Sequence, residues 1–131
     1  MKGSYILLIE VKKNSRIRVG SLGRITFEKG LYAYVGSAMS SLEGRIKRHI
    51  RDKKKTFWHI DYLLKSKNAK ITKILYKESK NKEECKVAKS VSRYGKPVIG
   101  FGSSDCKCES HLFKLRKLSE IENLGFKVSK I

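Results

Sequence analysis

The stretch Ser4–Val11, SYILLIEV, is the feature that most constrains the fold of this chain. It is nearly all apolar and rich in β-branched and aromatic residues, a composition typical of a strand buried on both faces. The chain has 131 residues, which is enough for one domain with a real core and too few for two comfortable ones. We therefore expect residues 1–131 to form a single domain built on a sheet that contains this strand.

Four more segments have patterns typical of strands. They are RIRV at 16–19, RITF at 24–27, the run Leu31–Gly36 and the run Ala69–Tyr76. The first two are expected to form a hairpin. Together with the predicted helices, these segments indicate an α/β (α+β) fold, with a small, mainly antiparallel sheet flanked by helices.

Three segments are expected to be helical. The first begins with a capping box in which Ser40 is the N-cap and Glu43 lies three residues later, and it runs to about Asp52. A second helix is expected from Thr56, and a third has Asn81 as its N-cap. The buried stripe of the first helix is predicted at Leu42, Ile46 and Ile50, and the third helix is predicted to end just before Gly95.

The formal net charge is +19, from 31 Lys and Arg against 12 Asp and Glu. The basic residues occur along the whole chain, and a polyanionic partner is the commonest reason to retain such a charge. Nucleic acid is the favoured partner, with DNA preferred over RNA. No helix has the pattern of a membrane-surface anchor, so a membrane partner is not expected. A lysine-rich composition also accompanies heat adaptation.

The length of the apolar runs and the number of cysteines bear on where the protein is found in the cell. The longest apolar run, Tyr5–Ile9, is far too short to span a membrane. Three cysteines, an odd number, argue against a disulfide scaffold and for a reducing interior. We expect a cytoplasmic protein.

The segment YVGSAMSSLEGRIKRH, Tyr34 to His49, carries the chemistry. Phosphodiester hydrolysis needs an activated water and positive charge for the developing phosphorane. Arg45 can fork onto phosphate oxygens as a lysine cannot, and His49, one turn later, can bind phosphate or relay a proton. Gly36 allows a close backbone turn beneath such a site.

This segment resembles the second half of the GIY-YIG nuclease signature. In that family the first half is a Gly-x-Tyr on an opening, neighbouring strand, which the resemblance assigns to GSY with Tyr5. The sequence GLY, with Tyr32, looks like the motif but lies on the same strand as Tyr34. Ser4 replaces the usual aliphatic residue, and the interval to Tyr34 is longer than usual. As a whole the chain is similar to the uncharacterised archaeal-type branch of this superfamily, through WHIDYLL and GFGSSDCKCESHLF.

The resemblance also implies a metal ligand, which the family takes from a glutamate on a later helix. Glu84 is the best match and Glu83 the rival. One carboxylate plus waters suits Mg²⁺ or Mn²⁺, since Mg²⁺ keeps much of its hydration shell. The implied catalytic set is Tyr5, Tyr34, Arg45, His49 and Glu84, and the expected nucleic-acid contacts are Gly36, Ser37, Lys47, Arg48 and His59.

The sequence CKCESH places Cys106, Cys108 and His111 within reach of one soft metal, with Cys85 as a potential fourth ligand. The spacing is not that of a standard zinc-finger knuckle, and no second pair exists. Buried or weakly reactive thiols are therefore favoured over a Zn²⁺ site.

The favoured hypothesis is a metal-dependent endonuclease, a hydrolase of phosphodiester bonds in DNA or structured nucleic acid, helped by a protein partner that supplies targeting. The alternative is a nucleic-acid-binding module that has the same scaffold and little or no cleavage. A zinc-dependent regulatory or adaptor protein is a third hypothesis, which rests on the cysteine cluster alone.

Overall fold

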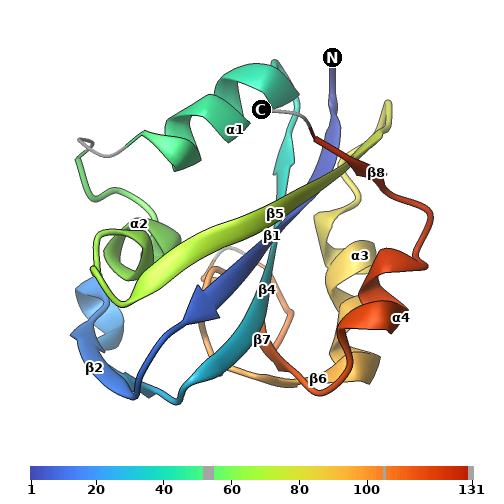
Figure 1. The fold of residues 1–131 in the computed structure, drawn as a ribbon. Helices are drawn as coiled ribbons and strands as arrows, with labels where there is room; N and C mark the ends of the chain where they lie inside the picture. The colour runs from blue at the N-terminus through green and yellow to red at the C-terminus, as the bar shows by residue number, and fades with distance from the viewer. Residues whose placement is uncertain (52–54, 105, 130–131) are drawn as a thin grey trace.

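A computed structural model describes residues 1–51, 55–104 and 106–129. In this part of the chain a six-stranded sheet has the order β6-β7-β4-β1-β5-β8 (Figure 1). Every neighbouring pair is antiparallel, which confirms the predicted sheet. The strands are β1 (Gly3–Val11), β4 (Gly30–Ala38), β5 (Ala69–Glu78), β6 (Gly95–Pro97), β7 (Leu112–Leu115) and β8 (Lys127–Val128). The expected hairpin forms a separate sheet of β2 (Ser15–Arg18) and β3 (Arg24–Phe27).

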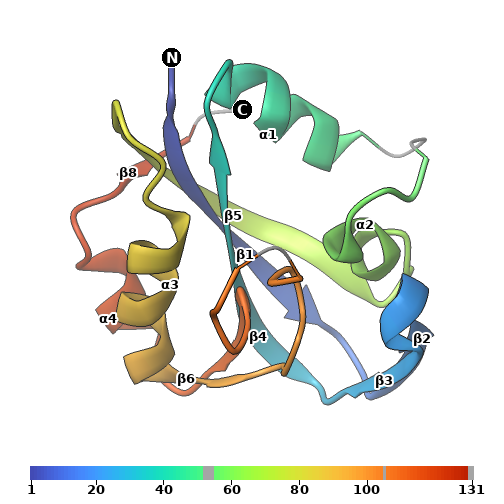
Figure 2. The same ribbon diagram turned by 180° about the vertical axis from the view of Figure 1, so that it is seen from behind.

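Helices cover both faces of the main sheet (Figures 1 and 2). They are α1 (Leu42–Ile50), α2 (His59–Leu64), α3 (Glu84–Val91) and α4 (Leu118–Glu122), with single 3₁₀ turns at Gly20–Leu22 and Ser92–Tyr94. Helices α1 and α2 pack on one face, and α3 and α4 pack on the other. No described helix has the length and apolar character needed to cross a membrane.

The central strand β1 explains this layering. Its side chains alternate between two apolar cores: Tyr5, Leu7 and Ile9 belong to the α1 side, and Ile6 and Leu8 to the α3 side. All five are at most 2% exposed. A strand buried on both faces needs a layer on each side, so this one segment requires the helix–sheet–helix arrangement.

The start of α1 differs from the prediction by one residue. Ser41, not Ser40, is the N-cap, because Ser41 has extended backbone and its Oγ accepts a hydrogen bond from Gly44 N at 3.0 Å. The helix ends at Ile50, and Asp52 lies outside the described residues. Ile50 is 42% exposed, whereas His49 is 2% exposed. The predicted stripe was therefore wrong at its last position, where the histidine takes the buried place.

Two other helix starts were predicted too early. Helix α2 begins at His59 because the Asp61 carboxylate reaches back and accepts hydrogen bonds from Phe57 N and Trp58 N, each at 2.9 Å. Helix α3 begins at Glu84, with Glu83 rather than Asn81 as the N-cap residue. It ends at Val91 and continues as a 3₁₀ turn up to Gly95, the first residue of β6.

Arg48 joins α1 to α2. Its Nη1 and Nη2 donate to the two Asp61 carboxylate oxygens, each at 2.9 Å, and its guanidinium lies 4.1 Å from the centroid of the Trp58 ring. The Asp61 side chain is fully buried and that of Arg48 is 21% exposed. Burial alone would raise the pKa of Asp61, but hydrogen bonds from Arg48 and two backbone amides hold it below its usual value. Asp61 therefore stabilises the fold above the ordinary aspartate pKa, and this contribution is lost as the pH falls through the lowered folded-state value.

We expect Arg48→Ala to lower the free energy of unfolding by about 2–3 kcal/mol, because it leaves the buried Asp61 carboxylate without its charged partner. Lys47→Ala, one residue away and exposed, should change it by less than about 0.5 kcal/mol. Urea unfolding of both variants measures the difference. Equal stabilities would contradict a structural role for Arg48.

Candidate functional site

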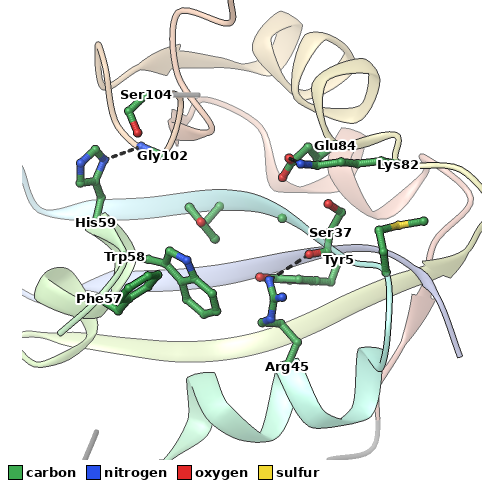
Figure 3. A pocket seen from close by; sticks show the side chains of 13 residues that line it. Tyr5, Ser37, Arg45, Phe57, Trp58, His59, Lys82, Glu84, Gly102 and Ser104 are labelled. Atoms are coloured by element: carbon green, nitrogen blue, oxygen red, sulfur yellow. Dashed lines mark hydrogen bonds and ion pairs between the residues drawn. The ribbon is translucent and has the colours of Figure 1, made fainter. Parts of the chain in front are cut away.

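A cavity of about 520 Å³ lies where β1 and β4 meet the first turns of α1 and α3 (Figure 3). Of the residues predicted from the sequence, it brings together Tyr5, Tyr34, Gly36, Ser37, Arg45, His59 and Glu84. The other lining residues are Met39, Phe57, Trp58, Lys82, Gly102 and Ser104. The lining therefore comes from both layers of helices and from the loop after β6.

The register of β1 and β4 places the two tyrosines side by side. Tyr5 lies opposite Gly36 and Leu7 lies opposite Tyr34, so Tyr5 and Tyr34 are diagonal neighbours on one face of the sheet. A Cβ at Gly36 would overlap the Tyr5 ring and its hydroxyl. The Tyr5 ring can therefore occupy its position only because residue 36 has no side chain. Tyr32 is not among the lining residues, and its hydroxyl donates to Glu28 O at 2.7 Å.

His49 contacts Tyr5 and is not one of the residues that line the cavity. Its Nε2 lies 2.7 Å from the Tyr5 hydroxyl, and its ring is 2% exposed. Tyr5 therefore faces the cavity, and the buried His49 ring is hydrogen-bonded to the Tyr5 hydroxyl. Burial raises the pKa of Tyr5 to about 12, although the Arg45 guanidinium opposes the shift. The pKa of Tyr34 is also raised. Burial is the largest cause, and the neighbouring Tyr5 is the next.

Arg45 enters the cavity from α1 (Figure 3). Its Nη1 donates to Ser37 O at 3.0 Å, and its guanidinium lies 4.5 Å from the centroid of the Trp58 ring. A strand carbonyl and an aromatic face therefore fix the plane of the guanidinium. An arginine held in this way can present its remaining N–H groups to an anion with little loss of side-chain entropy.

Glu84 faces Arg45 across the cavity, next to Lys82 (Figure 3). Its side chain is 16% exposed and its Oε1 lies 3.0 Å from Lys82 Nζ. Glu83 instead lies 4.0 Å from Lys86 and lines a separate, smaller hollow. The geometry therefore favours Glu84 over Glu83 as the carboxylate of this cavity.

Three other residues were predicted to contact nucleic acid, and they differ in whether they line the cavity. Lys47 is exposed on α1 and does not line the cavity. Arg48 is bound to Asp61, so a direct contact with nucleic acid is not favoured for it. His59 lines the cavity, and its Nδ1 accepts a hydrogen bond from Gly102 N at 2.8 Å. Burial lowers the pKa of His59, which agrees with a neutral ring in this role.

The sequence interpretation missed several lining residues. Phe57, which is 77% exposed, and Trp58 stand at the cavity mouth with ring centroids 5.7 Å apart. An aromatic pair between a basic run and a helix is a signal that could have found them. Lys82 carries no comparable signal in the sequence.

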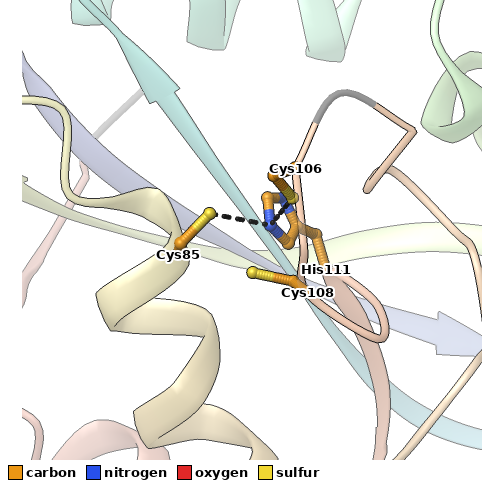
Figure 4. A group of neighbouring side chains, drawn as sticks. All are labelled: Cys85, Cys106, Cys108 and His111. Atoms are coloured by element: carbon orange, nitrogen blue, oxygen red, sulfur yellow. Dashed lines mark hydrogen bonds between the residues drawn. The ribbon is translucent and has the colours of Figure 1, made fainter.

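Cys85, Cys106, Cys108 and His111 form a second group (Figure 4). One ligand atom from each lies within 4.8 Å of those of the other three. The prediction that Cys106, Cys108 and His111 lie within reach of one metal, with Cys85 as a potential fourth ligand, is confirmed, since α3 and the loop before β7 bring the four together. The group could hold a metal ion. Burial, with hydrogen bonds among the thiols, raises the pKa of Cys85 to about 12, and burial also raises that of Cys108.

The sequence matches one family model, described as Domain of unknown function DUF123, over residues 4–130. No curated protein and no solved structure matches it. The family match extends over nearly the whole chain, from β1 to beyond β8, and includes both the cavity and the cysteine group. The chain therefore belongs to the family Domain of unknown function DUF123.

Proposed function

We propose that this protein is a GIY-YIG-type, metal-dependent nuclease that hydrolyses phosphodiester bonds in DNA or structured nucleic acid. The observation that carries the proposal is the convergence of Tyr5, Arg45 and Glu84, from three separate elements, on one cavity. One phosphate and one hydrated cation have to touch such groups together. The resemblance of Tyr34–His49 to the family signature supports the same assignment.

In this proposal Arg45 binds the non-bridging oxygens of the scissile phosphate and stabilises the charge that develops on them. Tyr5 holds the attacking water, and as the water oxygen bonds to phosphorus the phenol takes the water's proton and passes its own proton to His49 Nε2, 2.7 Å away. The bond from phosphorus to the leaving sugar oxygen breaks, and that oxygen takes up a proton from solvent water. Because burial raises the pKa of Tyr5 to about 12, this role requires nearby positive charge in addition to Arg45. His49 thus acts on Tyr5 rather than on the substrate.

The cavity fits one hydrated divalent cation, Mg²⁺ or Mn²⁺. Among the described residues that line it, Glu84 is the only carboxylate. The tyrosine hydroxyls and bound waters would supply the other oxygen ligands. A cation of this kind retains several waters and needs few protein ligands. When bound, it would supply the charge that lowers the pKa of nearby oxygen acids. Lys82 would have to leave Glu84, which its largely exposed side chain permits.

A cleavage screen tests the proposal. Labelled single-stranded, duplex, flap and junction DNA, with matching RNA, are incubated with the protein and either Mg²⁺ or Mn²⁺. Cleavage that requires the cation and is absent with EDTA is the expected result. If no substrate is cut by a folded protein that still binds DNA, the nuclease proposal fails.

The second candidate, a binding module without cleavage, draws on one specific contact. Lys82 neutralises Glu84 at 3.0 Å, and a permanent ion pair there would keep a cation out. The charge of +19 would still serve binding. Mn²⁺ binding by the wild type and by Lys82→Ala separates the two candidates, because a nuclease should bind the cation in both proteins, whereas a module blocked by the ion pair should bind it only after Lys82 is removed.

Binding to duplex DNA should weaken linearly on a log–log plot against salt, because several phosphates are neutralised by exposed lysines and arginines. Lys47→Ala should make the slope shallower by about 1, since one phosphate contact is lost. Lys29→Ala is the matched control, because Lys29 is exposed but lies beyond Gly30, at the other end of β4 from the cavity. An affinity that does not change with salt would contradict a nucleic-acid partner.

A further inference from the structure

The group of Cys85, Cys106, Cys108 and His111 has the dimensions of a tetrahedral site. Zn–S bonds of about 2.3 Å and a Zn–N bond of about 2.0 Å give a sulfur–nitrogen edge of roughly 3.5 Å. Two such edges are present: His111 Nε2 lies 3.8 Å from Cys85 Sγ and 3.5 Å from Cys106 Sγ. The widest separation in the group, 4.8 Å, is about 1 Å more than a sulfur–sulfur edge. Side-chain rotation can remove a difference of that size.

The chemistry of the ligands selects the metal. Three thiols and one imidazole are soft or borderline ligands, which favour Zn²⁺ and disfavour Mg²⁺. With four protein ligands the coordination shell is closed, as in structural zinc sites and unlike catalytic ones. A bound cation stabilises the thiolate form of its cysteine ligands.

The loop that carries His111 is anchored to the sheet through its backbone. His111 N donates to Phe101 O at 2.8 Å, and Val35 N donates to His111 O at 2.9 Å, so the loop is tied to β4. Cys85 comes from the first turn of α3 (Figure 4). A metal bound by both elements would therefore fasten the start of α3 to the loop before β7.

The two nitrogens of His111 face different groups. Nε2 points at the sulfurs, while Nδ1 lies 3.9 Å from Glu84 Oε2. Metal-binding histidines usually direct their second nitrogen at a carboxylate, which orients both groups. Glu84 is also the residue next to Cys85 in the chain. The cysteine group is thus linked twice to the carboxylate of the cavity, once through the backbone and once through His111.

We propose that Cys85, Cys106, Cys108 and His111 bind one structural Zn²⁺, which clasps α3 to the loop 101–111 and holds Glu84 at the cavity. Zinc binding stands independently of the proposed nuclease function. The consequence for Glu84 rests on that function. The site makes no contact with the substrate, so Cys85 and His111 are positioning residues.

The first experiment is metal analysis of the full chain, purified with a phosphine reductant and without a polyhistidine tag. We expect about one zinc per chain in the wild type and below about a tenth of that in Cys108→Ser. Ser90→Ala, a half-buried residue of α3 that is not one of the four ligands, is the control and should retain its zinc. If Cys108→Ser fails to fold, Co²⁺ titration of apo wild-type protein replaces it, and thiolate-to-cobalt charge-transfer absorption is expected.

The second experiment tests whether the bound zinc holds α3 to the loop before β7. Chelation should lower the melting temperature by roughly 10 °C or more, and should speed hydrogen exchange in residues 84–91, with both effects reversed by added Zn²⁺. A zinc-free wild type that gives no thiolate band with Co²⁺ would overturn the site. Zinc that can be removed without any change in exchange at α3 would overturn the clasp. Neither readout needs cleavage, so a failed nuclease assay leaves both conclusions intact.

Discussion

Arg45→Ala is expected to lower the rate of DNA cleavage by about 10²–10³-fold, the usual cost of removing one fixed donor to a developing oxyanion. The guanidinium is held by Ser37 O at 3.0 Å and lies over Trp58, so its position is set before substrate arrives. Because one charge among many contributes little to total affinity, the dissociation constant for DNA should change by less than about tenfold. Single-turnover cleavage and a binding titration measure the two effects separately.

Arg45→Lys is the informative companion variant. It keeps the positive charge but loses the planar fork that matches a phosphate, so its affinity should be near that of the wild type while its rate remains low. Melting temperatures show whether either variant has lost its packing on Trp58. If Arg45→Lys restored the full rate, a simple charge effect would replace the proposed bidentate role. If Arg45→Ala cleaved like the wild type, the cavity would not be the active site.

The parts of the fold that follow local patterns could be predicted from the sequence. The alternation and apolar content of the strands predicted β1, β4 and β5 within a few residues. Helix starts could not be predicted as well, because they depend on side chains that reach back. Asp61 binds the amides of Phe57 and Trp58 and thereby delays α2. Two serines in succession left the choice between Ser40 and Ser41 to backbone geometry.

The candidate site was predictable where one segment carries several groups in register, as between Tyr34 and Arg45. The site was less predictable where tertiary packing alone decides which side chains meet. The spacing of Arg45 and His49 put them on one helical face, yet Arg45 lines the cavity and His49 contacts Tyr5 from a buried position. Lys82 and Cys85 join their groups only through the tertiary placement of α3, which no local pattern records.

The last prediction concerns the carboxylate. Glu84→Gln should reduce Mg²⁺-dependent cleavage by at least about 10²–10³-fold, because an amide is nearly isosteric with the carboxylate but carries no charge for a hard cation. Raising the Mg²⁺ or Mn²⁺ concentration should recover part of the rate, since the variant has lost affinity for the cation. DNA binding without metal should be unchanged or slightly tighter, because one negative charge is removed from the cavity. The measurement is the cleavage rate as a function of metal concentration.

Glu83→Gln is a matched control, since it removes the same charge one residue away, at the N-cap of α3, where the side chain lines a different hollow. The two variants have equal net charge, so a difference between them cannot come from electrostatic attraction of DNA as a whole. Zinc content should be normal in both, which separates loss of the cavity carboxylate from loss of the cysteine site beside it. Equal loss of cleavage in the two variants would point to the start of α3 rather than to Glu84. Full cleavage by Glu84→Gln would remove the cation from this cavity and favour the binding module.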